Sequence, residues 1–194
     1  MIRIAIVVGS TRPGRKAEPV ARWVHEHAGR HGGAEFELVD IADYDLPLLD
    51  EPVPPSQGKY EKPHTKRWAA KIASFDGFVF VTPEYNHGPS GALKNAIDFL
   101  HAEWNDKAAG FVSYGSAMGV RAVEQLRLVM GEIKIADVRA QVMLSLATDF
   151  ENYQAFKPAE RHAKTLATVF DQVIEWATAL KTVREGRAPK ARAA

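Results

Sequence analysis

The sequence contains no cysteine among its 194 residues. This absence excludes disulfides, iron–sulfur clusters, zinc–thiolate sites and a cysteine nucleophile, and it fits a reducing cytosol. The chain also lacks any apolar run near the ~20 residues that a membrane-spanning helix needs. No basic segment followed by an apolar stretch marks a secretory signal at the N-terminus. We therefore expect a cytoplasmic protein without a membrane-spanning segment.

Neither sign of charge is in excess, because 25 Lys and Arg side chains face 24 Asp and Glu side chains, for a formal net charge of +1. Such a balance gives no general attraction to nucleic acid or to an anionic membrane surface. The hydrophobic share of 46% is enough to build a core. We expect a single domain over residues 1–180 and a basic, flexible tail over residues 181–194.

Strand and helix patterns alternate along the chain. Five apolar runs rich in β-formers are predicted strands, at residues 2–8, 36–39, 78–82, 108–113 and 138–146. Apolar side chains at helical spacing follow them at residues 16–28, 65–74, 92–100, 120–133 and 158–180. This alternation predicts an α/β fold, a flavodoxin-like three-layer sandwich around a five-stranded parallel sheet of order 2-1-3-4-5. Residues 41–66, which contain five prolines, and residues 148–157 are predicted to be irregular.

The predicted strand order makes the first and third strands neighbours. The loops after the first, third and fourth strands should therefore meet in one crevice at the carboxyl edge of the sheet, where open α/β sheets bind ligands. We expect Ser90 to cap the helix after the third strand, because a serine hydroxyl can accept from the first-turn N–H groups.

The loop after the first strand has the composition of an anion site. Gly9 permits a close turn, and Ser10 and Thr11 offer hydroxyl donors. Arg12, Arg15 and Lys16 add positive charge where a helix begins, so the helix dipole favours the same anion. A phosphate monoester suits this loop, although the Walker and Rossmann glycine patterns are both absent.

The other two loops offer an aromatic ring and backbone amides. The loop after the third strand could line one edge of a flat heterocycle with Pro83, Glu84, Tyr85 and Asn86. The loop after the fourth strand, residues 113–116, could face a carbonyl edge. Taken singly, each loop could equally be a simple turn with its aromatic side chain packed inward. The predicted convergence favours a shared site. The complete candidate set is Ser10, Arg12, Arg15, Lys16, Ala17, Pro83, Glu84, Tyr85, Asn86, Ser113, Tyr114 and Gly115.

Two other patterns resemble sites but are better explained without chemistry. His25, His27 and His31 lie on one helix without the HExxH pattern, so we expect no metal site. Ser90 and Ser116 are not in the G-x-S-x-G context of an esterase nucleophile.

These motifs resemble those of the NADPH-dependent FMN reductase family, flavodoxin-like proteins that include chromate, quinone and azo-dye reductases. The matching residues are Gly9-Ser10-x-Arg12, Pro83-Glu84-Tyr85-Asn86 with Gly88 through Lys94-Asn95, and Tyr114-Gly115 with Gly119. The resemblance covers about residues 1–180. It implies that the first loop binds the FMN phosphate and that the other two border the isoalloxazine ring from opposite sides. One departure is Arg15, where many members carry a serine.

The resemblance implies an FMN-dependent NAD(P)H oxidoreductase that passes hydride to a second acceptor by a ping-pong mechanism. NADPH or NADH is the expected donor, and a flavin, quinone, azo compound or metal oxyanion the acceptor. Since the flavin carries the chemistry, we expect no catalytic acid or base from the protein. Family members imply a homodimer or homotetramer. A non-enzymatic electron carrier and a flavin-bearing assembly partner remain the alternatives.

Overall fold

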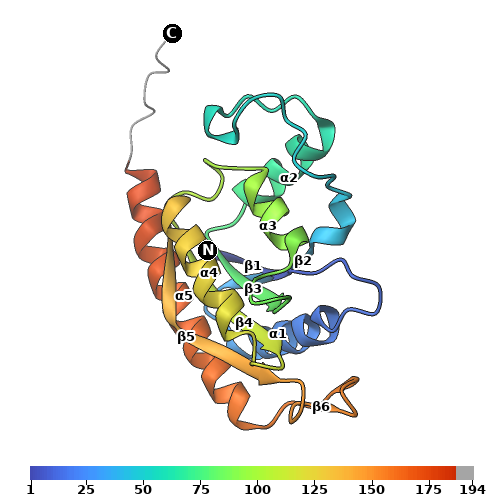
Figure 1. Ribbon diagram of the computed structural model, residues 1–194. Helices are drawn as coiled ribbons and strands as arrows, with labels where there is room; N and C mark the ends of the chain where they lie inside the picture. Colours follow the sequence, from blue (N-terminus) through green and yellow to red (C-terminus); the bar gives the residue numbers. More distant parts are fainter. Residues whose placement is uncertain (187–194) are drawn as a thin grey trace.

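The computed structural model describes residues 1–186 of the chain. Its main sheet has five parallel strands in the order β2-β1-β3-β4-β5 (Figure 1). The strands are β1 (Arg3–Val8), β2 (Glu35–Asp40), β3 (Gly77–Pro83), β4 (Lys107–Gly115) and β5 (Ile135–Ser145). The strand order that the sequence predicted is therefore confirmed.

Helices cover both faces of this sheet, which gives three layers (Figure 1). One core forms between the sheet and the helices α1 (Ala17–His31) and α5 (Arg161–Glu185). The other core forms against α2 (Pro63–Ala73), α3 (Gly91–Asp98) and α4 (Val120–Glu132). The predicted flavodoxin-like sandwich is thus the observed architecture.

The central strand β3 shows why an unbroken apolar run was needed. Phe78 and Phe80 belong to the core under α2, α3 and α4, while Val79 and Val81 belong to the core under α1 and α5. All four side chains are completely buried. A strand packed on both faces requires apolar residues at every position, because successive side chains point to opposite faces.

The two stretches predicted to be irregular contain some regular structure. The first holds two short 3-10 helices, η1 (Ile41–Tyr44) and η2 (Pro55–Gln57), and α2 begins at Pro63, within it. The second forms a small antiparallel hairpin of β6 (Phe150–Glu151) and β7 (Ala155–Phe156). The prediction of irregular structure was wrong for these short segments.

The last helix also continues past residue 180, where the sequence predicted the flexible tail. Lys181 Nζ lies 3.1 Å from Asp76 Oδ2, and Arg184 pairs with the other carboxylate oxygen. These ion pairs, at the amino end of β3, hold the final turns of α5 against the sheet. The tail prediction is therefore wrong for residues 181–185, and residues 187–194 lie outside the described part of the chain.

Candidate functional site

Three loops meet at the carboxyl edge of the sheet. Val8 of β1 pairs with Val81 of β3, and Pro83 of β3 pairs with Tyr114 of β4, so the strands end side by side. A cavity of about 110 Å³ lies between their loops, and we call it the cationic cavity. Its lining residues are Arg12, Gly14, Arg15, Lys16, Pro83, Glu84, Tyr85, Tyr114, Gly115 and Leu146. The candidate residues Ser10, Ala17, Asn86 and Ser113 are not among them.

The first loop is held against strand β3 by close backbone contact. Gly9 N donates to Val81 O at 2.9 Å, and a Cβ at Gly9 would lie 2.6 Å from that same oxygen. Only glycine fits such a close approach. Ser90 Oγ donates to Gly9 O at 2.6 Å and accepts from Leu93 N at 3.1 Å. Ser90 therefore caps α3, as predicted, and also ties that helix to the first loop.

The buried Ser10 connects two of the loops. Its Oγ lies 3.2 Å from Tyr85 Oη and accepts from Arg12 N at 3.4 Å. Only 1% of Ser10 is exposed, so its hydroxyl forms these bonds below the surface of the loop. Ser10 fixes the ring of Tyr85 beside the first loop rather than lining the cavity itself.

The three cations of the first loop have different environments. Arg15 forms an ion pair with Asp40 at the end of β2, and its Nη1 donates to Ser10 O at 2.9 Å. Lys16 Nζ reaches the amide oxygen of Gln154 at 3.4 Å. Within residues 1–186, neither Arg12 nor Lys16 has a carboxylate partner. Arg12 and Lys16 are therefore the cations available to an anion, while the charge of Arg15 is already balanced.

The start of α1 adds donors to the same place. Its N-cap, Lys16, makes no side-chain cap bond to the first turn. N–H groups in the first turn of a helix have no intrahelical partner and favour an anion. Ala17, the first residue of α1, therefore contributes through its backbone, because its side chain carries no polar group.

Tyr114 brings a buried hydroxyl into this cationic environment. The residue is 5% exposed, and its hydroxyl has no side-chain hydrogen-bond partner among the described residues. Burial raises the pKa of this phenol, while nearby Arg12 and Arg15 and the backbone N–H of Ala17, at the start of α1, act in the opposite direction. A tyrosine hydroxyl can both donate and accept, so a ligand could still bond to it. The hydroxyl, the cations and the helix start together fit a phosphate-bearing ligand.

The second loop is a tight turn with unusual backbone angles. Tyr85 N donates to Gly88 O at 2.9 Å, and Gly88 N donates back to Tyr85 O at 3.1 Å. The two residues between them, Asn86 and His87, have φ angles of 48° and 72°. His87 O accepts from the amide of Gln125 on α4. The turn is strained at His87, and such strain is concentrated at functional sites.

Two candidate side chains serve the scaffold of the site. The Glu84 carboxylate is 5% exposed, pairs with the Arg121 guanidinium and accepts from Arg121 N at 3.2 Å, at the start of α4. Ser113 Oγ donates to Met118 O at 2.7 Å and accepts from Gln141 Nε2 at 3.0 Å. These side chains fix α4 and β5 behind the cavity rather than facing a ligand.

Sequence reasoning missed a fourth wall of the cavity. Leu146 lines it from the end of β5, just before the β6–β7 hairpin. The hairpin packs by aromatic contacts, with Phe150 6.0 Å from Tyr114 and Phe156 5.8 Å from Trp23 between ring centroids. The only sequence signal was this pair of phenylalanines in an otherwise polar stretch.

Asp149 holds this fourth wall in place. Only 1% of it is exposed. Its Oδ2 accepts from Ser145 N at 2.9 Å, and its Oδ1 accepts from Ala159 N at 3.2 Å and lies 2.9 Å from His162 Nε2. The backbone donors lower the pKa of this carboxyl against the opposing effect of burial. Asp149 therefore joins β5, the hairpin and α5.

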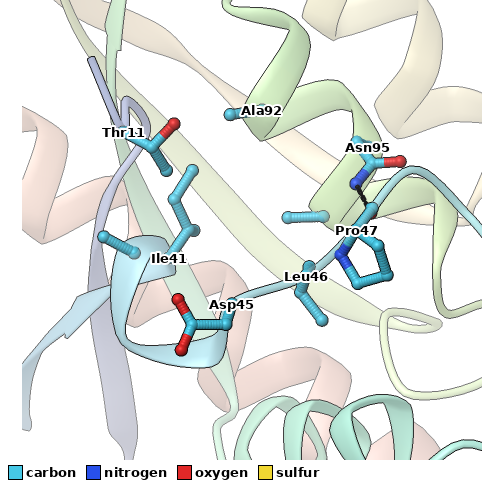
Figure 2. Close-up of a pocket in the computed structure, with 9 residues that line it drawn as sticks. Thr11, Ile41, Asp45, Leu46, Pro47, Ala92 and Asn95 are labelled. Carbon is cyan, nitrogen blue, oxygen red and sulfur yellow. Dashed lines mark hydrogen bonds between the residues drawn. The ribbon is translucent and has the colours of Figure 1, made fainter.

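A larger cavity, of about 460 Å³, lies beside the first loop at Thr11 (Figure 2). We call it the apolar cavity. Its lining residues are Thr11, Ile41, Ala42, Asp45, Leu46, Pro47, Ala92, Asn95 and Ala96. None of the predicted site residues lines it, although Thr11 directly precedes Arg12 of the cationic cavity.

Other features of the described chain lie apart from both cavities. His27 Nδ1 lies 2.9 Å from Trp23 O, and His31 pairs with Asp171 at 3.0 Å, so both histidines have local partners. Within residues 1–186, no group of three or more His, Asp or Glu side chains is arranged to hold a metal ion. No helix of that part is long and apolar enough to cross a membrane.

The fold and the loop geometry define a flavodoxin-like α/β protein with a cationic cavity at the switch point of its sheet. The chain belongs to the NADPH-dependent FMN reductase family, whose family model matches residues 2–149. The family that the sequence motifs resembled is therefore confirmed.

Individual relatives agree with this assignment. An NAD(P)H-dependent FMN reductase of Nectria sp. is 40% identical over 77% of this chain and 79% of its own length. One of Schizosaccharomyces pombe is 40% identical over 84% of this chain and 83% of its own. Among solved structures, the flavoenzyme FerB of Paracoccus denitrificans, an NAD(P)H:(acceptor) oxidoreductase, superposes with a TM-score of 0.72. It is 22% identical and covers 92% of this chain and 98% of its own, which supports the fold.

Proposed function

We propose that this protein passes hydride from NAD(P)H through bound FMN to a second small-molecule acceptor in a ping-pong reaction. The observation that carries the proposal is the convergence of Arg12, Lys16 and the α1 start on the buried hydroxyl of Tyr114. FMN has both a phosphate and a planar ring, and the cationic cavity offers partners for both. Bound FMN would supply the hydride-accepting and hydride-donating chemistry.

The chain's own residues would bind and orient the cofactor. Arg12 and Lys16, with the first-turn N–H groups of α1, would hold the phosphate, because charge-assisted hydrogen bonds are the strongest available. Pro83 and Tyr85 would border the ring on one side and Tyr114 with Gly115 on the other. Leu146 and the hairpin behind it would exclude water from that edge.

No side chain of the cavity is suited to act as a general base. Glu84 is paired with Arg121 and faces α4. The raised pKa of the Tyr114 phenol keeps it protonated at neutral pH, so it can donate a hydrogen bond but not remove a proton. This environment supports a positioning role for all three loops.

The acceptor, the assembly and the location are finer parts of the proposal. Relatives include a quinone reductase of Pseudomonas putida, 36% identical over 57% of this chain, and a quinone is our preferred acceptor class. Flavin, azo compounds and metal oxyanions are the other candidates. We propose that the protein is cytoplasmic. We also propose that it is a homodimer or homotetramer, and light scattering would measure the mass of the assembly.

The test is a spectrum of the purified protein followed by two separate half-reactions. We expect a visible flavin band that NAD(P)H bleaches without oxygen and that a quinone then restores. Steady-state rates at several quinone concentrations should give parallel double-reciprocal lines. Protein that neither retains FMN nor oxidises NAD(P)H when FMN is added would refute the proposal. Retained FMN without NAD(P)H turnover would favour an electron carrier.

A further inference from the structure

The apolar cavity has preformed walls. Asn95 of α3 donates from Nδ2 to Pro47 O at 2.6 Å and accepts at Oδ1 from Leu49 N at 3.0 Å. Both ends of this amide are therefore used to hold residues 47–49, of which Pro47 lines the cavity. Figure 2 shows the bond between Asn95 and Pro47. On the opposite side, Ile41 is 3% exposed, and Ala42 N donates to Asp40 Oδ1 at 3.0 Å. Side-chain and backbone bonds thus fix the cavity from two directions.

The charge of this cavity is opposite to that of its neighbour. Asp45 is the one charged residue among those lining it, and no cation lines it. Asp45 and Thr11 are both exposed, and within residues 1–186 the Asp45 carboxylate has no ion-pair partner and the Thr11 hydroxyl has no hydrogen bond. The other lining side chains are aliphatic or proline, apart from the engaged Asn95. Such a cavity suits a flat, uncharged group that carries hydroxyl donors and disfavours a phosphate.

The two cavities are close enough to serve one dinucleotide. Thr11 lines the apolar cavity and Arg12 lines the cationic cavity, and consecutive Cα atoms are only ~3.8 Å apart. A dinucleotide is long enough to place its nicotinamide beside Tyr85 and its nucleoside across the loop. A carboxylate on the ribose hydroxyls is a general device for recognising NADH, whereas a 2′-phosphate calls for an arginine.

We propose that the apolar cavity binds the adenosine of the hydride donor, with Asp45 accepting hydrogen bonds from its ribose, so that the enzyme prefers NADH to NADPH. This inference rests on the proposed function. The 2′-phosphate of NADPH would lie beside an unpaired carboxylate with no lining cation, and like charges repel at short range. The preference for NADH over NADPH would then be set in the apolar cavity and not in the cationic cavity.

The variant Asp45→Asn tests the carboxylate with little change of shape. Asp45 has a φ of 46°, a left-handed conformation that asparagine also tolerates. We expect kcat/KM for NADH to fall about tenfold, mainly through KM, because a charge-assisted hydrogen bond becomes a neutral one. For NADPH, kcat/KM should rise. Asp43→Asn, on the 3-10 helix whose C-cap is Asp45 but outside the cavity, is the matched control and should leave both values unchanged.

A binding measurement separates recognition from turnover. By calorimetry on the FMN-loaded protein, ADP-ribose should bind more tightly than its 2′-phosphorylated form, and Asp45→Asn should remove this difference. An Asp45→Asn variant with the wild-type NADH-to-NADPH ratio, or an equal effect of Asp43→Asn, would overturn the inference. Equal binding of the two ribose compounds to the wild type would overturn it as well.

A truncated donor distinguishes this inference from the proposed function. N-benzyl-1,4-dihydronicotinamide carries the hydride but has no adenosine. It should reduce the flavin of the wild type and of Asp45→Asn at equal rates. Failure to reduce the wild-type flavin would count against the proposed function, while the ADP-ribose measurement would still decide whether the cavity binds adenosine.

Discussion

The cationic and apolar cavities share a loop and differ in almost everything else. One is about 110 Å³ and carries Arg12, Arg15 and Lys16, while the other is about 460 Å³ and carries Asp45 as its charged residue. The smaller one collects residues from four strand ends and from the start of α1. We propose the smaller cavity as the phosphate site, although the other cavity has the larger volume. The reason is that three cations and the start of α1 converge on the smaller one.

The largest expected effect is the loss of FMN when the free cations are removed. In Arg12→Ala/Lys16→Ala, the Kd for FMN should rise by about a thousandfold, because each charge-assisted bond is worth about 2 kcal/mol. Riboflavin, which lacks the phosphate, should bind the wild type and the variant alike. Titration of flavin fluorescence measures both affinities.

The matched control for this double variant is Arg22→Ala/Arg30→Ala. It removes the same charge from exposed positions on α1 and leaves the cavity lining unchanged. If riboflavin affinity falls as much as FMN affinity, or if the control behaves like the test variant, the cationic cavity does not hold the phosphate.

The fourth wall of the cationic cavity should depend on Asp149. In Asp149→Ala, the donors of Ser145 and Ala159 lose their buried acceptor, and we expect a loss of about 3 kcal/mol in the free energy of unfolding. Urea denaturation measures it, and the variant should also hold FMN less tightly through displacement of Leu146. Glu151→Ala, exposed on the same hairpin, should change neither value.

The pH dependence of this contribution follows from the sign of the pKa shift. The folded-state pKa of Asp149 is lowered from 3.8, so its stabilisation is fully present above that value and is lost as pH falls through the lower folded pKa. The wild type should therefore lose stability below about pH 4 more steeply than Asp149→Asn. Parallel acid unfolding curves would contradict this role.

The sequence predicted the fold well because buried strands impose their pattern on every residue. The strand from Phe78 to Val81 packs on both of its faces, so each of its four side chains is apolar. This apolar run allowed β3 to be located in the sequence. The convergence of the three loops then followed from strand order. By contrast, β6 and β7 have two residues each, too few for any periodic signal.

The parts that sequence reasoning missed depend on partners distant in the chain. Asp40 balances Arg15 across 25 positions, and Asp76 holds Lys181 across 105. Asp149 binds backbone N–H groups, which carry no residue-specific signature. Nothing in a local pattern distinguishes such a balanced cation from a free one, so Arg15 and Lys16 looked equivalent.

The wall of the apolar cavity at Pro47 should depend on Asn95. Asn95→Ala removes both bonds to residues 47–49, and we expect ADP-ribose to bind about tenfold more weakly. FMN affinity should not change, since Asn95 does not line the cationic cavity. Calorimetry with both ligands checks the two cavities separately. Equal losses for FMN and ADP-ribose would show that the two cavities are not independent.

The last effect concerns stability alone and a cation remote from both cavities. Lys107, at the start of β4, is 4% exposed, and its Nζ donates to Ile72 O at 2.8 Å. Burial lowers the pKa of Lys107 from 10.5 to about 7, so between these values the folded protein sheds a proton that the unfolded chain keeps. Stability should therefore rise with pH above 7, by at most about 1.4 kcal/mol per pH unit. Urea unfolding at pH 7, 8 and 9 should show this rise in the wild type and not in Lys107→Met. A rise of equal slope in both would mean that the charge of Lys107, unlike that of Arg12 and Lys16, has no measurable consequence.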